Sequence, residues 1–188
     1  MTCMSIDPRN PTKPMKLCTL PTRIWDEISV DFYGPIPNAH VYLMVVIDDY
    51  SRYPFVETLQ NITAATVTSR LRNIFSVFRT VSVVRTDNGP PFQGREFANF
   101  ATEMGFKHRR ITPLHPEANG IAKRFMKTLT KTVLASHVQG QNLKKRTQYV
   151  PNELSFCSCT GVPPSTLMFG RNIRTKLPEF RPEKPDKY

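Results

Sequence analysis

The chain has 188 residues, of which 39% are hydrophobic and 22% are charged. This length suits one domain, and the composition is typical of a globular protein and excludes a fibrous or disordered one. The longest apolar run, Val41–Ile47, is far shorter than the roughly 20 residues that a membrane span needs, so we expect no membrane association. The proline-containing, polar first twenty residues predict no signal peptide.

The formal net charge is +11, and it is unevenly distributed. Residues 1–94 carry 9 basic and 8 acidic side chains, whereas residues 95–188 carry 17 and 7. A strongly basic half indicates a polyanionic partner, with nucleic acid first and an anionic membrane surface second. A basic surface without a partner is the alternative. The four cysteines lack zinc-binding spacing and are expected to be free thiols of an intracellular protein.

Hydrophobic periodicity predicts an alternating order of strands and helices. In chain order these are strands at Ile24–Phe32, Val41–Ile47 and Tyr53–Leu59, a helix at Thr63–Arg79, a strand at Val81–Arg85, a helix at Glu96–Met104, a strand at Lys107–Ile111 and a long helix at Asn119–Val138. Short turns between the first three strands require antiparallel pairing, and the helices between later strands serve as crossovers. The pattern predicts a three-layer α/β domain with a mixed five-stranded sheet and helices on both faces.

Two aspartates are candidates for chemistry. Asp31 interrupts an apolar strand, where a carboxylate is costly unless it is hydrogen-bonded, at an end, or holding a metal. An exposed Asp on an edge strand explains it equally well. Asp87 begins a rigid Asp-Asn-Gly-Pro-Pro loop at the end of a strand, a common position for functional residues, although the same sequence is also ordinary turn chemistry.

Six separated motifs, in order, resemble the catalytic core of retroviral and retrotransposon integrases. They are Trp25–Pro35, Val46–Arg52, Thr86–Phe92, Ile111–Pro116, Asn119–Gly120 and Arg124–Leu129. The tail Thr160–Arg171 is similar to the segment that follows the core in Ty3/gypsy-type elements. The resemblance implies a ribonuclease H-like fold and a polynucleotidyl transferase in which three carboxylates hold Mg²⁺ or Mn²⁺ for DNA integration. Asp31 and Asp87 match the first two acids and would be metal ligands.

The position of the third acid holds Lys123. The family places a glutamate there, and thirty-five residues lie between it and the second aspartate. The same number of residues separates Asp87 from Lys123. A protonated lysine has no lone pair for a metal. At 4 Å each pair of unit charges is worth about 4 kcal/mol at an effective dielectric near 20. We therefore expect weak or absent metal binding and an inactive site. An active Mg²⁺-dependent integrase and a protein-interaction scaffold remain alternatives.

A basic surface is expected beside this site. The resemblance and the positive charges together predict that it binds the DNA phosphate backbone without sequence preference, through Lys127, Lys131, Arg109, Arg110, Lys144 and Lys145, with His108 on the same strand as the two arginines. A solvated helix face is the alternative. The family also implies a nuclear location and a homodimer, although Pro151 would interrupt a helix near the face through which such proteins dimerise.

Three segments are expected along the chain. Residues 1–22 form a Pro-rich arm, a remnant of the zinc-binding module that precedes the core in relatives. Residues 23–140 form the integrase-like domain, and residues 141–188 form a C-terminal extension.

Overall fold

The computed structural model describes residues 21–37, 39–111, 125–127, 129–131, 161–171 and 173. The elements are β1 (Glu27–Tyr33), β2 (Tyr42–Asp48), β3 (Pro54–Leu59), α1 (Ala64–Phe78), β4 (Val83–Thr86), α2 (Pro90–Gln93), α3 (Arg95–Met104), β5 (Lys107–Arg110) and α6 (Pro164–Phe169). Residues 125–127 and 129–131 are also helical. Among these residues, none of the helices has the length and apolar character needed to cross a membrane.

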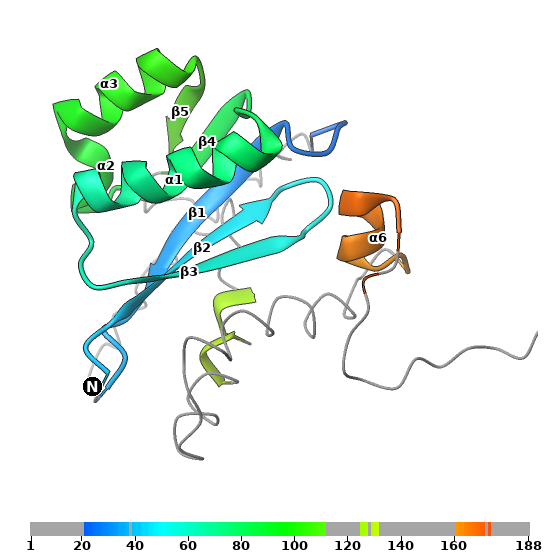
Figure 1. Cartoon of the computed structure of the whole chain (residues 1–188), viewed down its shortest axis with the longest axis horizontal. Helices are drawn as coiled ribbons and strands as arrows, with labels where there is room; N and C mark the ends of the chain where they lie inside the picture. The colour runs from blue at the N-terminus through cyan, green and yellow to red at the C-terminus, as the bar shows by residue number, and fades with distance from the viewer. Residues whose placement is uncertain are drawn as a thin grey trace, which may run out of the picture.

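The strands form one mixed five-stranded sheet in the order β3-β2-β1-β4-β5 (Figure 1). β1 pairs antiparallel with β2, and β2 antiparallel with β3, as short turns require. β4 pairs parallel with β1 on its other side, and β5 parallel with β4. The predicted three-layer architecture is confirmed, and β1 lies at the centre of the sheet.

One face of the sheet is covered by α1 and α3 (Figure 1). Alternation directs Ile28 and Val30 of β1 toward these helices, together with Val46 of β2. Helix α1 begins behind Thr63, whose hydroxyl accepts the amide of Thr66 at 3.3 Å. The buried residues of the helices complete this core, and they are Val67, Leu71, Ile74, Phe75, Phe97, Phe100 and Ala101.

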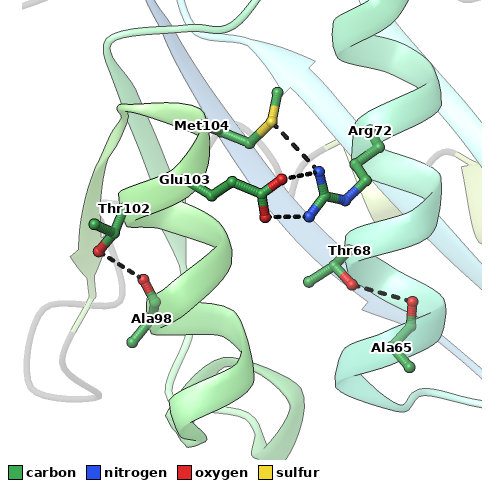
Figure 2. A network of polar contacts seen from close by, with 7 residues as sticks. All are labelled: Ala65, Thr68, Arg72, Ala98, Thr102, Glu103 and Met104. Carbon is green, nitrogen blue, oxygen red and sulfur yellow. Dashed lines mark hydrogen bonds and ion pairs between the residues drawn. The ribbon is translucent and has the colours of Figure 1, made fainter.

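A polar clamp joins the outer surfaces of these two helices (Figure 2). Both terminal nitrogens of Arg72 in α1 bond the carboxylate of Glu103 in α3. The guanidinium also lies 3.8 Å from the sulfur of Met104 and 5.0 Å from the ring centroid of Phe100. This bidentate geometry lowers the pKa of Glu103 and fixes the relative position of α1 and α3 at the solvent edge.

The opposite face carries a second apolar cluster. Leu43, Val45 and Ile47 of β2 contact Met126 and Leu129 from the helical residues of 125–131. In Figure 1 this segment lies across the sheet from α1 and α3. Helices on both faces are therefore confirmed.

The C-terminal part of the chain returns to the core through α6, which lies at the β2–β3 turn (Figure 1). The ring of Phe169 meets Tyr53 edge-on at 5.0 Å and Phe78 at 6.3 Å. The hydroxyl of Ser51 lies 3.7 Å from the sulfur of Met168. Residues from the segment 141–188 thus pack against the β2–β3 turn and the end of α1.

Three predicted boundaries differ from the structure by two residues or more, including the strand predicted at Val81–Arg85, since β4 begins at Val83. β1 begins at Glu27 and not at Ile24, because the chain turns at Trp25, which has φ 60° and donates its amide to Asp48 Oδ1 at 2.9 Å. The predicted loop at Asp87–Pro91 contains the start of α2. Proline is compatible with the first turn of a helix because that turn needs no amide donor.

Candidate active site and basic surface

The register of the two central parallel strands places Asp31 and Asp87 at equivalent positions in the sequence of the two strands. Val30 of β1 is paired with Thr86 of β4, and the residue that follows each of them is an aspartate. Asp31 also pairs with Val45 across the antiparallel side. It is half-buried, and its Oδ1 accepts the amide of Phe32 at 2.9 Å. Because β1 is central, the alternative of an edge-strand aspartate is excluded.

Asp87 stands where β4 becomes a loop, and it is exposed. Its Oδ1 accepts the amide of Gly89 at 2.9 Å, which folds the loop back over the carboxylate. A Cβ on Gly89 would lie 2.9 Å from that oxygen, so this approach requires glycine. Phe92 is buried three residues later and anchors the loop in the core. The carboxylate is therefore held by turn chemistry at a point where it still faces solvent.

The helical residues of 125–131 pack on the same face as Asp31. Met126 and Leu129 belong to the cluster of Val45, which is the cross-strand partner of Asp31. Lys127 and Lys131 are exposed, as expected for the basic stripe beside the apolar one. Three further predicted site residues, Lys123, Lys144 and Lys145, lie outside the described residues, and so do all four cysteines.

The two arginines of β5 have different surroundings. Arg110 is exposed at the edge of the sheet. Arg109 is half-exposed, and its Nη1 lies 3.9 Å from Glu27 Oε2, so any phosphate must share it with this carboxylate. His108 points away from this surface, because its ring meets the edge of Phe97 at 4.7 Å. Its predicted place among the phosphate-binding residues is wrong.

Sequence reasoning missed a buried charged cluster on the same face as Asp31. Arg85 of β4 bonds Glu27 of β1 and lies 3.5 Å from Asp49 Oδ2. The hydroxyl of Ser29 donates to Asp49 Oδ1 at 2.7 Å. Burial raises the pKa of Asp49 to about 6, against the opposing effects of Ser29 and Arg85. The available signal was an arginine within an apolar strand, which is costly unless paired.

The donor set does not complete a metal site within the part of the chain that the structure describes. Asp31 and Asp87 provide two carboxylates, and no group of three or more His, Cys, Asp or Glu side chains gathers there in a metal-binding arrangement. A pair of hard Mg²⁺ ions prefers more oxygen ligands than two carboxylates supply. In the sequence, Lys123 stands at the interval from Asp87 where the resemblance predicts the third acid, and a protonated lysine cannot serve as a metal ligand.

Comparison with known proteins agrees with this geometry. Residues 24–116 match the family model described as the integrase core domain. An uncharacterised protein of Caenorhabditis elegans is 28% identical over 172 residues, covering 90% of this chain and 13% of its own length. The Pro-Pol polyprotein of feline foamy virus is 28% identical over 176 residues, covering 89% of this chain and 15% of its own length. The chain thus spans a small part of these relatives.

Solved structures show the same fold. An intasome of simian T-cell lymphotropic virus in complex with a PP2A regulatory subunit gives a TM-score of 0.75 at 18% identity, covering 95% of this chain and 66% of that one. The HTLV-2 integrase catalytic core domain in complex with magnesium, in its trimeric form, gives 0.66 at 18% identity, covering 78% and 98%.

The family is thereby defined. Residues 24–116 are an integrase core domain of the retroviral type, with a ribonuclease H-like fold.

Proposed function

We propose that this protein is an integrase core of retroelement origin that binds DNA and no longer performs Mg²⁺-dependent strand transfer. The observation that carries the proposal is the lysine at position 123, at the interval from Asp87 where the family has its third acid. The pairing of Val30 with Thr86 supports the proposal that the first two acids, Asp31 and Asp87, lie next to each other.

Electrostatics supports the loss of metal binding. Replacing a glutamate by a lysine changes the charge of the three-residue site from −3 to −1. Repulsion of an ammonium by a divalent cation at 4 Å costs about 8 kcal/mol at an effective dielectric near 20, in addition to the lost ligand. In the proposed state the ammonium of Lys123 pairs with Asp31 and Asp87 and neutralises part of their charge without a metal.

The same charges support DNA as the partner. Lys127 and Lys131 are exposed on the helix that packs over the Asp31 face, and Arg110 is exposed at the sheet edge. Such cations contact phosphates without reading bases. One structural relative was solved as an intasome, and the magnesium-bound HTLV-2 core was solved in dimeric and trimeric forms. We extend this to a DNA complex, a homodimer and a nuclear location for this protein.

Calorimetric titration with Mg²⁺ and Mn²⁺ tests the proposal directly. The wild-type protein should show no binding in the micromolar range, whereas Lys123→Glu should bind measurably because it restores three oxygen-donating side chains. The matched control is Lys123→Glu combined with Asp87→Asn, which should lose that binding again. Micromolar binding of either ion by the wild-type protein would contradict the proposal and favour an active integrase.

A further inference from the structure

A short chain of hydrogen bonds connects His108 to the backbone of Asp87. His108 of β5 and Thr86 of β4 lie on neighbouring strands, and His108 Nε2 is 2.9 Å from Thr86 Oγ1. The same hydroxyl donates to the carbonyl oxygen of Asp87 at 2.7 Å. Thr86 is fully buried, so its hydroxyl is shielded from bulk water.

The direction of the two hydrogen bonds follows from the donors that are available. A carbonyl oxygen accepts only, so the single hydroxyl proton of Thr86 points at Asp87. The hydroxyl oxygen must then accept a hydrogen bond donated by the N–H at His108 Nε2. Burial lowers the pKa of His108, with the charge of Arg110 as the second cause, which favours the neutral ring. The structure therefore requires the tautomer with its proton on Nε2.

The residues at both ends of this series of hydrogen bonds are held in place. The centroid of the imidazole ring lies 4.7 Å from that of Phe97, in a T-shaped arrangement, and 6.1 Å from that of Phe92. Residues of α3 and α2 therefore determine where Nε2 points. Thr86 is β-branched and has a restricted χ1 angle in a strand. At the other end, the carboxylate of Asp87 is bonded to Gly89. The side chain and the carbonyl of Asp87 thus have separate restraints.

We propose that His108 is a positioning residue for Asp87, acting through the hydroxyl of Thr86. By holding the carbonyl of Asp87, it orients the peptide that leaves β4 and so sets the direction of the adjacent carboxylate. This assignment goes beyond the proposed function, because it applies whether a metal, an ammonium or neither neutralises that carboxylate. Its failure would leave the question of metal binding unchanged.

The first test is the tautomer of His108 in the full-length protein. Long-range ¹H–¹⁵N correlation spectra of ¹⁵N-histidine-labelled protein at pH 7.5 distinguish a protonated Nε2 from a protonated Nδ1. The resonance is assigned by its absence in His108→Gln. A proton on Nε2 is the expected result. A proton on Nδ1 would overturn the proposal, since Nε2 could then only accept from Thr86 and the hydroxyl could not hold the carbonyl.

The second test uses two matched pairs of variants. His108→Phe retains an aromatic ring without the donor, and His108→Gln retains a donor near the position of Nε2. Thr86→Val removes the hydroxyl, and Thr86→Ser retains it. Amide exchange of Asn88 and Gly89 is measured relative to amides of β2, which report global unfolding.

His108→Phe and Thr86→Val should accelerate this relative exchange on the order of fivefold, the size expected for one lost hydrogen bond. His108→Gln and Thr86→Ser should stay within about twofold of the wild type. Equal acceleration in both members of a pair, or none in either, would show that these residues serve packing alone. If Thr86→Val does not fold, the His108 pair decides.

Discussion

The ring of Phe32 stacks on the ring of Phe92, with centroids 5.4 Å apart and planes inclined by 23°. Phe32 follows Asp31 in β1, and Phe92 lies in α2, shortly after Asp87. The contact belongs to the core beneath α1 and α3, on the other face of the sheet from the acids. It joins the two acid-bearing segments from the opposite face of the sheet.

This stacking predicts a large effect of Phe92→Ala. Phe92 is only 2% exposed, and truncation of a buried phenylalanine leaves a cavity that costs about 3–5 kcal/mol. Urea unfolding of the full chain measures the change. Val77→Ala is the control, because Val77 is 72% exposed and its loss should cost less than about 0.5 kcal/mol. Similar losses for both variants would contradict the anchoring role.

The loop of Asp87 predicts that Gly89→Ala differs from Gly94→Ala. A Cβ at Gly89 would meet Asp87 Oδ1 at 2.9 Å, whereas the nearest neighbour of one at Gly94 is 4.0 Å away. The carboxylate must rotate in the first variant and lose the amide of Gly89, at a cost of about 1 kcal/mol. Urea unfolding should show a larger loss for Gly89→Ala than for Gly94→Ala, because Gly94 is the N-cap of α3 but has no close neighbour at the position of a Cβ. Equal stability of the two variants would refute the proposed close approach.

The buried cluster predicts that Arg85→Met is strongly destabilising at pH 7. The substitution leaves Glu27 and Asp49 without their buried partner, which typically costs about 3–5 kcal/mol. Arg109→Met is the matched control, because Arg109 approaches the same Glu27 from a half-exposed position and should cost less than about 1 kcal/mol. Chemical unfolding of both variants decides, and a small cost for Arg85→Met would show that the cluster is hydrated.

Asp49 predicts a specific dependence of stability on pH. Its folded-state pKa of about 6 lies above the unfolded value of 3.8, so the folded protein holds this proton more tightly. The associated stability is fully present below pH 3.8 and is lost as the pH rises through 6. Relative to the wild type, Asp49→Asn should gain about 3 kcal/mol between pH 3.5 and pH 7. The free energies of unfolding of the wild type and of Asp49→Asn, measured across this pH range, should converge or cross. Parallel pH profiles of the two proteins would argue against the raised pKa.

The exposed lysines predict salt-dependent duplex binding. Lys127→Glu should weaken binding to unrelated DNA sequences equally and reduce the slope of log K against log salt by about 1. Arg70→Glu is the control, since Arg70 lies on α1 across the sheet and changes the net charge equally. Fluorescence anisotropy at several salt concentrations measures both slopes. An equal reduction by the two variants would point to net charge alone, and a flat wild-type slope would favour a protein-interaction scaffold.

The sequence was sufficient for the elements whose periodicity is strong. The apolar run of β2 and the amphipathic pattern of α1 predicted both elements to within a residue or two. The start of β1 was missed because Trp25 is apolar and continues the strand pattern, yet its backbone is turned by a bond to Asp48. That bond depends on residues 23 positions apart, which local propensity does not capture.

The candidate site shows the same division. Spacing and motifs identified Asp31 and Asp87, and strand register then accounts for their proximity. The contacts of Arg85 with Glu27 and Asp49 depend on which strands are neighbours and on a diagonal reach across them, so no pattern within one segment could reveal them. His108 was read as a basic residue, but its surroundings are aromatic.

The packing of α6 against the core determines which truncated fragments of this chain are suitable for experiments. Tyr53 and Phe78 each meet the ring of Phe169 from elements more than 90 residues earlier in the chain. A fragment ending at residue 140 would leave those two rings facing water without their cover. Such a truncated protein would expose an additional hydrophobic patch next to the β2–β3 turn. Aggregation of the fragment would therefore give no information about the oligomeric state of the intact chain.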